Sequence, residues 1–176
     1  MVGSPILSSV TLRIRSGSQK KADLIFITRS LRGKIFSGAA GRRKERLFMA
    51  TWGDVKGFLI NNCDAKEEKN GLMSMVISYK DGRNQLVVVC RREVNGADWI
   101  DISSPVGTLN SGTVEVALEV LSNADCGGLV KIGDTHAVRH CIPIADLSNE
   151  ELVGPLGIVA SVADILEERL IGGDNL

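Results

Sequence analysis

The chain has 176 residues, of which 44% are hydrophobic and 24% charged, which fits a soluble globular protein with one domain rather than two. No apolar run approaches the roughly 20 residues of a membrane-spanning helix, and none near the N-terminus is long enough for a signal peptide. The four cysteines include no C-x-x-C pair, which disfavours both a disulfide framework and a zinc knuckle. We therefore expect a cytoplasmic protein with reduced thiols.

The formal net charge of zero conceals an uneven distribution along the chain. Residues 1–48 carry eleven Lys or Arg against two acidic residues, a net charge of +9. Residues 49–176 carry ten against nineteen, a net charge of −9. We predict a boundary at this point. A basic leader, expected to be disordered because of its Gly, Ser and Arg content, precedes an acidic domain that begins at Met49.

Three interpretations of the leader stay open. It is an upstream extension, with Met49 as the natural start; or a basic arm that binds nucleic acid; or an organelle transit peptide. The acidic balance of residues 49–176 disfavours nucleic-acid binding by the domain itself. Nucleic acid is thus expected as a partner only through residues 1–48.

The first helix of the domain is predicted directly after Thr51. Thr51 and Asp54 have the spacing of a capping box, with Asp in the place of Glu. The apolar residues that follow recur at helical spacing, and the polar run "NNCDAKEEKNG" ends the helix.

Three strands joined by tight turns are predicted next. They are "LMSMVISY", "QLVVVCRREV" and "ADWIDISSPV", the last ended by Pro105. The second strand is nearly all apolar at its start, which favours a central position with helices on one face. "KDGRN" and the pair Asn95-Gly96 provide the hairpin turns.

A second helix, "TVEVALEVLSNAD", precedes a hairpin that turns at Gly133-Asp134, and a third helix closes the domain. Ser148 and Glu151 form a second capping box. Because an interior proline removes a helical hydrogen bond, we expect Pro155 to kink or restart this last helix. The order α-β-β-β-α-β-β-α predicts an α+β fold with a mainly antiparallel five-strand sheet.

This element order resembles that of type III secretion chaperones and of the bacterial YbjN family. The stretches that carry the resemblance are "LMSMVISYKDGRNQLVVVCRREV", "TVEVALEVLSNADCGGLVKIGDTHAVRHCIPI" and "LSNEELVGPLGIVASVADILEERL", within residues 49–171. The resemblance implies a non-enzymatic protein that binds other polypeptides and is dimeric in the chaperone relatives. It supplies no catalytic or ligand-binding residues.

Catalytic chemistry finds little support in the sequence. His136 and His140 lie on one face of a predicted strand, with Arg139 and Cys141 on the other, and could begin a metal site only with further ligands. Asp98 and Asp101 point to opposite faces, which disfavours paired carboxylate chemistry, and Asp101 is expected to be solvated or to bind a partner. We expect no catalytic residue, no metal and no cofactor.

The sequence favours a protein-binding module, of the chaperone or regulatory-adaptor kind, that forms a homodimer; the identity of any other protein partner stays open. The alternative is a nucleic-acid-associated regulator acting through the leader. The last helix is apolar over more than one face, and such a helix usually buries the excess. The predicted interface residues lie on the third strand and the last helix: Trp99, Ile100, Ile102, Ile158, Val162 and Ile165.

Overall fold

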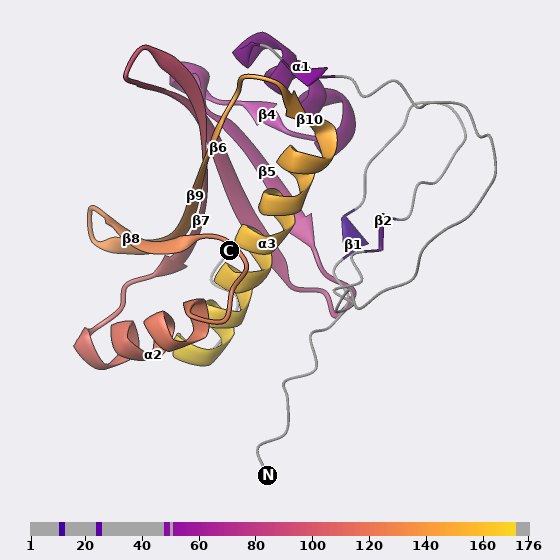
Figure 1. The fold of residues 1–176 in the computed structure, drawn as a ribbon. Helices are drawn as coiled ribbons and strands as arrows, with labels where there is room; N and C mark the ends of the chain where they lie inside the picture. The colour runs from indigo at the N-terminus through magenta and orange to yellow at the C-terminus, as the bar shows by residue number, and fades with distance from the viewer. Residues whose placement is uncertain (1–10, 13–23, 26–47, 50, 172–176) are drawn as a thin grey trace, which may run out of the picture.

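The computed structural model describes residues 11–12, 24–25, 48–49 and 51–171, and shows an antiparallel sheet packed with helices (Figure 1). The predicted leader falls mostly outside the described residues. The α-helices of the described part are α1 (Trp52–Cys63), α2 (Ser111–Leu121) and α3 (Asn149–Leu170), and a short 3-10 helix, η1, spans Lys69–Gly71. The α+β class and the order of the principal elements agree with the sequence-based expectation.

The main sheet has six strands rather than the five predicted. Its order is β4-β5-β6-β7-β9-β8, and every neighbouring pair is antiparallel. The extra strand is β4, only two residues long, in the polar run after α1; such a short pairing has no periodicity for the sequence to reveal. The six strands are β4 (Lys66–Glu67), β5 (Met73–Ser78), β6 (Asn84–Val94), β7 (Ala97–Gly107), β8 (Gly128–Ile132) and β9 (Thr135–Pro143).

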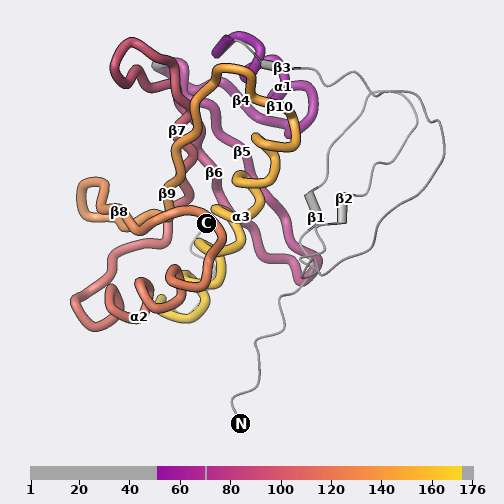
Figure 2. Tube along the Cα trace, in the orientation of Figure 1, coloured from indigo at the N-terminus to yellow at the C-terminus, as the bar shows by residue number. Residues whose placement is uncertain are grey.

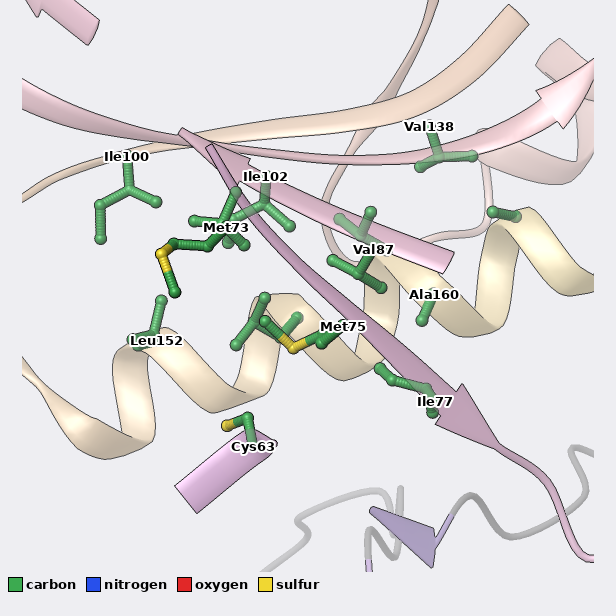
Figure 3. Packing of buried hydrophobic residues seen from close by; sticks show 14 of the residues in the cluster. Cys63, Met73, Met75, Ile77, Val87, Ile100, Ile102, Val138, Leu152 and Ala160 are labelled. Atoms are coloured by element: carbon green, nitrogen blue, oxygen red, sulfur yellow. The ribbon is translucent and has the colours of Figure 1, made fainter. Parts of the chain in front are cut away.

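The helices cover one face of the sheet, with α3 lying across its centre (Figures 1 and 2). Alternate residues of the strands point toward α3, as Met75 and Val87 do against Ala160 (Figure 3). Burial follows the same period of two, so that Met73, Met75 and Ile77 are buried on β5 while Val76 and Ser78 are exposed. The inward-pointing residues of the central strands therefore belong to the core between the sheet and α3.

The local signals of the sequence determine where the elements begin and turn. Thr51 and Ser148 each accept a hydrogen bond from the backbone N–H three residues on, and both capping boxes are complete. Asn95 and Gly96 have φ angles of 53° and 78°, as the β6–β7 turn requires. These predictions are confirmed.

Two predictions based on proline are wrong. The expected restart of α3 at Pro155 does not occur. One helix runs through the proline, and Leu152 and Leu156, three residues before it and directly after it, are fully buried in the core. Strand β7 continues past Pro105 to Gly107, where an irregularity in the pairing with β9 absorbs the missing N–H.

Two short antiparallel pairs lie outside the main sheet. The first joins β1 (Thr11–Leu12) to β2 (Leu24–Ile25). The second joins β3 (Phe48–Met49) to β10 (Leu147–Ser148), so β3 lies across the boundary predicted between leader and domain. Among the described residues, no helix is both long and apolar enough to cross a membrane.

Candidate functional site: the uncovered face of the sheet

The face of the sheet that points away from α1, α2 and α3 is the most distinctive surface of the part of the chain that the structure describes. We call it the uncovered face. None of these three helices packs against it, and its residues are those that alternate with the buried core positions. Large residues such as Val76, which is 60% exposed, therefore lie where an antiparallel sheet would ordinarily present polar side chains.

An apolar row crosses this face from one strand to the next. The register pairs Val76 with Leu86, Pro105 with Ala137, and Ala137 with Val130. The pairing of Val88 with Ser103, continued by two residues, places Pro105 beside Leu86. We call these five residues the apolar row: Val76, Leu86, Pro105, Ala137 and Val130. Val76 is exposed, Leu86, Pro105 and Val130 are half-buried, and the small Ala137 between its neighbours is only 4% exposed.

A cluster of three charged residues lies on the same face. The Nε of Arg139 donates to Oδ1 of Asp101 at 2.8 Å, and its Nη2 also contacts Oδ2 of the same carboxylate. The Nη1 of Arg92 reaches Oδ2 at 3.3 Å. The Asp101 side chain is 10% exposed, against 25% for Arg139 and 49% for Arg92. A buried carboxylate thus holds two guanidinium groups at the surface, and the expectation that Asp101 is solvated is wrong.

The charge of the uncovered face is opposite to that of the domain. Its strands carry three basic side chains, Lys66, Arg92 and Arg139, and one acidic side chain, Asp101, which is already neutralised. Glu68, just after β4, adds a second carboxylate at the edge, where it accepts a hydrogen bond from Ser74. Three basic groups against two acidic ones leave the face basic, within a region whose net charge is −9.

The acidic residues at the far ends of β6 and β7 belong to the opposite face. Glu93 and Asp98 pair in register with each other, on the side of the sheet that α3 covers. There Asp98 forms an ion pair with Arg91 at 2.7 Å. These carboxylates therefore do not offset the basic charge of the uncovered face.

Two cysteines flank the buried carboxylate. Cys90 and Cys141 are the residues that pair with Asp101 on its two sides, from β6 and β9. They are separated by two strand spacings, about 10 Å, which is too far for a disulfide. Partial burial raises the pKa of both thiols, and the neighbouring Asp101 raises it further. Neither cysteine is thus an activated nucleophile.

The two histidines lie on one face of β9, as their spacing predicts, and that face is the one that the helices cover. His136 is buried and its Nδ1 accepts a hydrogen bond from the N–H of Leu109 at 3.2 Å, while His140 pairs in register with Ile102. In the described ranges, no three His, Cys, Asp or Glu side chains lie close enough together to hold a metal ion. The buried hydrogen bond gives His136 a structural role.

The predicted interface residues divide into two groups. Ile100 and Ile102 are completely buried, and Val162 is 8% exposed, all within the chain's own core. Their inward direction follows from the parity of β7 and from the position of α3 on the sheet. The partly accessible residues are Trp99, on the uncovered face, and Ile158 and Ile165, on α3.

A second polar network connects the β5–β6 turn to the last helix. The Arg83 guanidinium lies 3.1 Å from Asp164 and 2.7 Å from Glu168, both on α3, and 3.0 Å from Asp81. It also lies over the ring of Tyr79, 5.8 Å from the ring centre. Burial, opposed by Arg83, raises the pKa of the Asp164 carboxyl to about 6. This network fixes the hairpin to the helix.

A mainly apolar hollow of about 380 Å³ lies beside the start of α3, next to Leu147 and Pro155. Its one glutamate, Glu151, is already used in the capping box of the helix. Asp146 is the second carboxylate that lines the hollow.

Comparisons of the chain with models of protein families, with curated proteins and with solved structures gave no match. The candidate site therefore depends on the geometry of this chain. Sequence reasoning missed the cluster of Arg92, Asp101 and Arg139, although it correctly placed Arg139 and Cys141 on the face opposite the histidines. The missing information was the register that places β6 and β9 on either side of β7.

Proposed function

We propose that this protein is a non-enzymatic module that binds another polypeptide through the uncovered face of its sheet. The observation that carries the proposal is the apolar row, which crosses five strands and ends at the exposed Val76. Exposed apolar patches that are bordered by polar residues often mark sites where proteins bind one another. The neighbouring guanidinium groups add polar contacts that can fix the orientation of a partner.

The resemblance to YbjN proteins and secretion chaperones supports the same function. It rests on the order of helices and strands, which the chain adopts, and it implies a chaperone or a regulatory adaptor. All four cysteines are unpaired, which is typical of proteins in a reducing compartment, and we place the module in the cytoplasm. The raised thiol pKa values and the neutralised Asp101 support a binding role over a catalytic one.

We also propose that the protein forms a homodimer, and that α3 supplies the contact. Ile158 and Ile165 are separated by seven residues, two helical turns, and both are only partly buried. A dimer through α3 would leave the uncovered face available to a different protein. Light scattering on the full chain, compared with Ile165→Asp, tests this contact.

The alternative function uses the basic leader to bind nucleic acid. Eleven basic residues against two acidic ones support it. Binding by the full chain to a single strand of about 20 nucleotides would then fall steeply with added salt. A variant in which Lys20, Lys21, Arg42 and Arg43 become Gln would lose that binding, whereas uncovered-face variants would keep it.

Site-specific photo-crosslinking in living cells tests the leading proposal. A photoreactive amino acid replaces Val76, which is 60% exposed on the uncovered face, or Leu118, which is 54% exposed on α2 and serves as the matched control. We expect discrete protein adducts from position 76 that are absent from position 118. Each adduct is identified and reconstituted from purified components, and its affinity is measured with Val76→Asp and Leu118→Asp.

The proposal requires that only Val76→Asp weakens the reconstituted complex, by tenfold or more. Equal crosslinking from both positions, adducts with nucleic acid alone, or no adduct at position 76 would refute it. Thermal unfolding of each variant shows that the folded state is retained.

A further inference from the structure

The uncovered face also indicates what kind of partner it fits, an inference that rests on the proposed function. The apolar row crosses five strands, and four strand spacings amount to about 19 Å. A helix rises 1.5 Å per residue, so a helix of about 13 residues spans the row. A partner element lying across the strands therefore matches the row in length.

The orientation of the strands explains why a helix suits this face. The backbone hydrogen bonds of a sheet lie in its plane, so a segment resting on the face finds no N–H or C=O group to pair with. Buried backbone groups must nevertheless be paired, and a helix pairs them internally. On the opposite face, α3 already packs in this way across three of these strands, β6, β7 and β9.

The charges specify one flank of that helix. The guanidinium groups of Arg92 and Arg139 meet at Asp101, which lies four residues along the strands from the apolar row, at about 13 Å. Lys66 and Val88 lie between, in the intermediate row. A helix of about 10 Å diameter that covers the apolar row and Val88 brings one flank beside the guanidinium groups. Acidic side chains on that flank would be attracted to them.

Other occupants of the face fit less well. The leader of this chain is itself basic, with a net charge of +9, and would be repelled. A second copy packed face to face about a two-fold axis that runs along the central strands would bring the same arginines of both copies together. Nucleic acid would meet, among the described residues of this face, one accessible aromatic side chain, Trp99, with an acidic domain around it.

We propose that the uncovered face binds an amphipathic helix of another protein, with an aliphatic stripe over the apolar row and an acidic flank beside Arg92 and Arg139. The carboxylates of the partner pair with the N–H groups that Asp101 leaves exposed. Asp101 fixes the two guanidinium groups before the partner arrives, which reduces the side-chain entropy lost on binding.

A displayed library of peptides about 16 residues long tests this proposal against the full chain. Each peptide carries a fixed aliphatic stripe at helical spacing and flanking positions randomised among Glu, Gln and Lys. We expect selection of Glu on one flank only. The best peptide should lose at least tenfold in affinity with the double variant Arg92→Glu, Lys66→Glu, because each reversal replaces attraction by repulsion.

Arg91→Glu is the matched control, since Arg91 is the neighbour of Arg92 on β6, equally exposed, but directed to the helix side. Its affinity for the selected peptide should stay within twofold of the unchanged protein. Thermal unfolding and the milder Arg92→Gln, which should lose affinity less than the reversal, separate an effect on binding from an effect on folding.

Three results would overturn the acidic-helix proposal: selection of Gln or Lys on both flanks, a loss for Arg91→Glu as large as that of the double variant Arg92→Glu, Lys66→Glu, or no binding peptide. Tight binding of a single strand of nucleic acid that Arg92→Glu abolishes would assign the face to nucleic acid instead. If neutral peptides bind and Val76→Asp abolishes their binding, the polypeptide-binding function stands and only the acidic specificity fails.

Discussion

Removing Arg139 should cost more stability than removing the carboxylate it contacts. Arg139→Met retains the aliphatic stem and leaves the Asp101 side chain, 10% exposed, with Arg92 at 3.3 Å and a hydrogen bond from the Cys141 thiol. Breaking a buried pair by deleting one partner typically costs about 3–5 kcal/mol. Because Arg92 remains and Arg139 is itself 25% exposed, we expect about 2 kcal/mol here.

The opposite change leaves a different residue without its partner. Asp101→Asn removes the charge but keeps a carbonyl oxygen as acceptor, and the Arg139 guanidinium can turn to water. We expect a cost of about 1 kcal/mol. In the double variant the neutral amide at position 101 no longer needs a cation, so the total cost should be roughly 1.5 kcal/mol, half the sum of the single costs.

Urea unfolding followed by tryptophan fluorescence measures these three differences, since Trp99 pairs in register with Arg92 on the same face. Equal costs for the two single variants, or additive costs in the double variant, would refute the reasoning. Either result would mean that the Asp101 carboxylate is stabilised by water rather than by Arg139.

Two further predictions concern pH and the backbone. The folded-state pKa of Asp164, about 6, lies above the usual Asp value, so its contribution to stability is fully present below about pH 4 and is lost as the pH rises through 6. In urea unfolding, the free energy of unfolding of Asp164→Asn minus that of the unchanged chain should rise by about 2 kcal/mol between about pH 4 and 7. A difference that stays constant with pH would contradict the assignment. Gly107 has a φ of 111°, and an added Cβ would lie 2.5 Å from Cδ1 of Ile171, so Gly107→Ala should cost about 1–2 kcal/mol in thermal unfolding. Gly57→Ala, inside α1 with nothing within 4 Å, should instead stabilise by about 0.5–1 kcal/mol, and the same sign for both would count against this account.

Most of the fold could be predicted from patterns within a few residues of each other. Capping boxes at Thr51 and Ser148 and the turn at Asn95 are local, because the hydrogen bonds or dihedral angles concerned join residues no more than three apart. The two-residue β4 gave no such pattern. Pro155 predicted a restart of the last helix that does not occur, since the burial of Leu152 and Leu156 outweighs the low helix propensity of proline.

The candidate site could be predicted only in pieces. The alternation of β9 correctly separated Arg139 and Cys141 from the histidines. The same alternation on β7 would have predicted that Ile100 and Ile102 point inward, once it was known which face of the sheet the helices cover. No periodicity says which face of a strand a helix will cover.

The sequence by itself therefore determined the α+β class, the order of the elements, and their caps and turns, because each depends on residues near one another in the chain. The tertiary structure decided which strands are neighbours and in what register. That register brings Asp101 to Arg92, nine residues away, and to Arg139, 38 residues away. The packing of α3 on the other face decided that the two guanidinium groups and Val76 would remain accessible. A binding surface assembled across strands is a property of register and layer order, neither of which is encoded in any one segment.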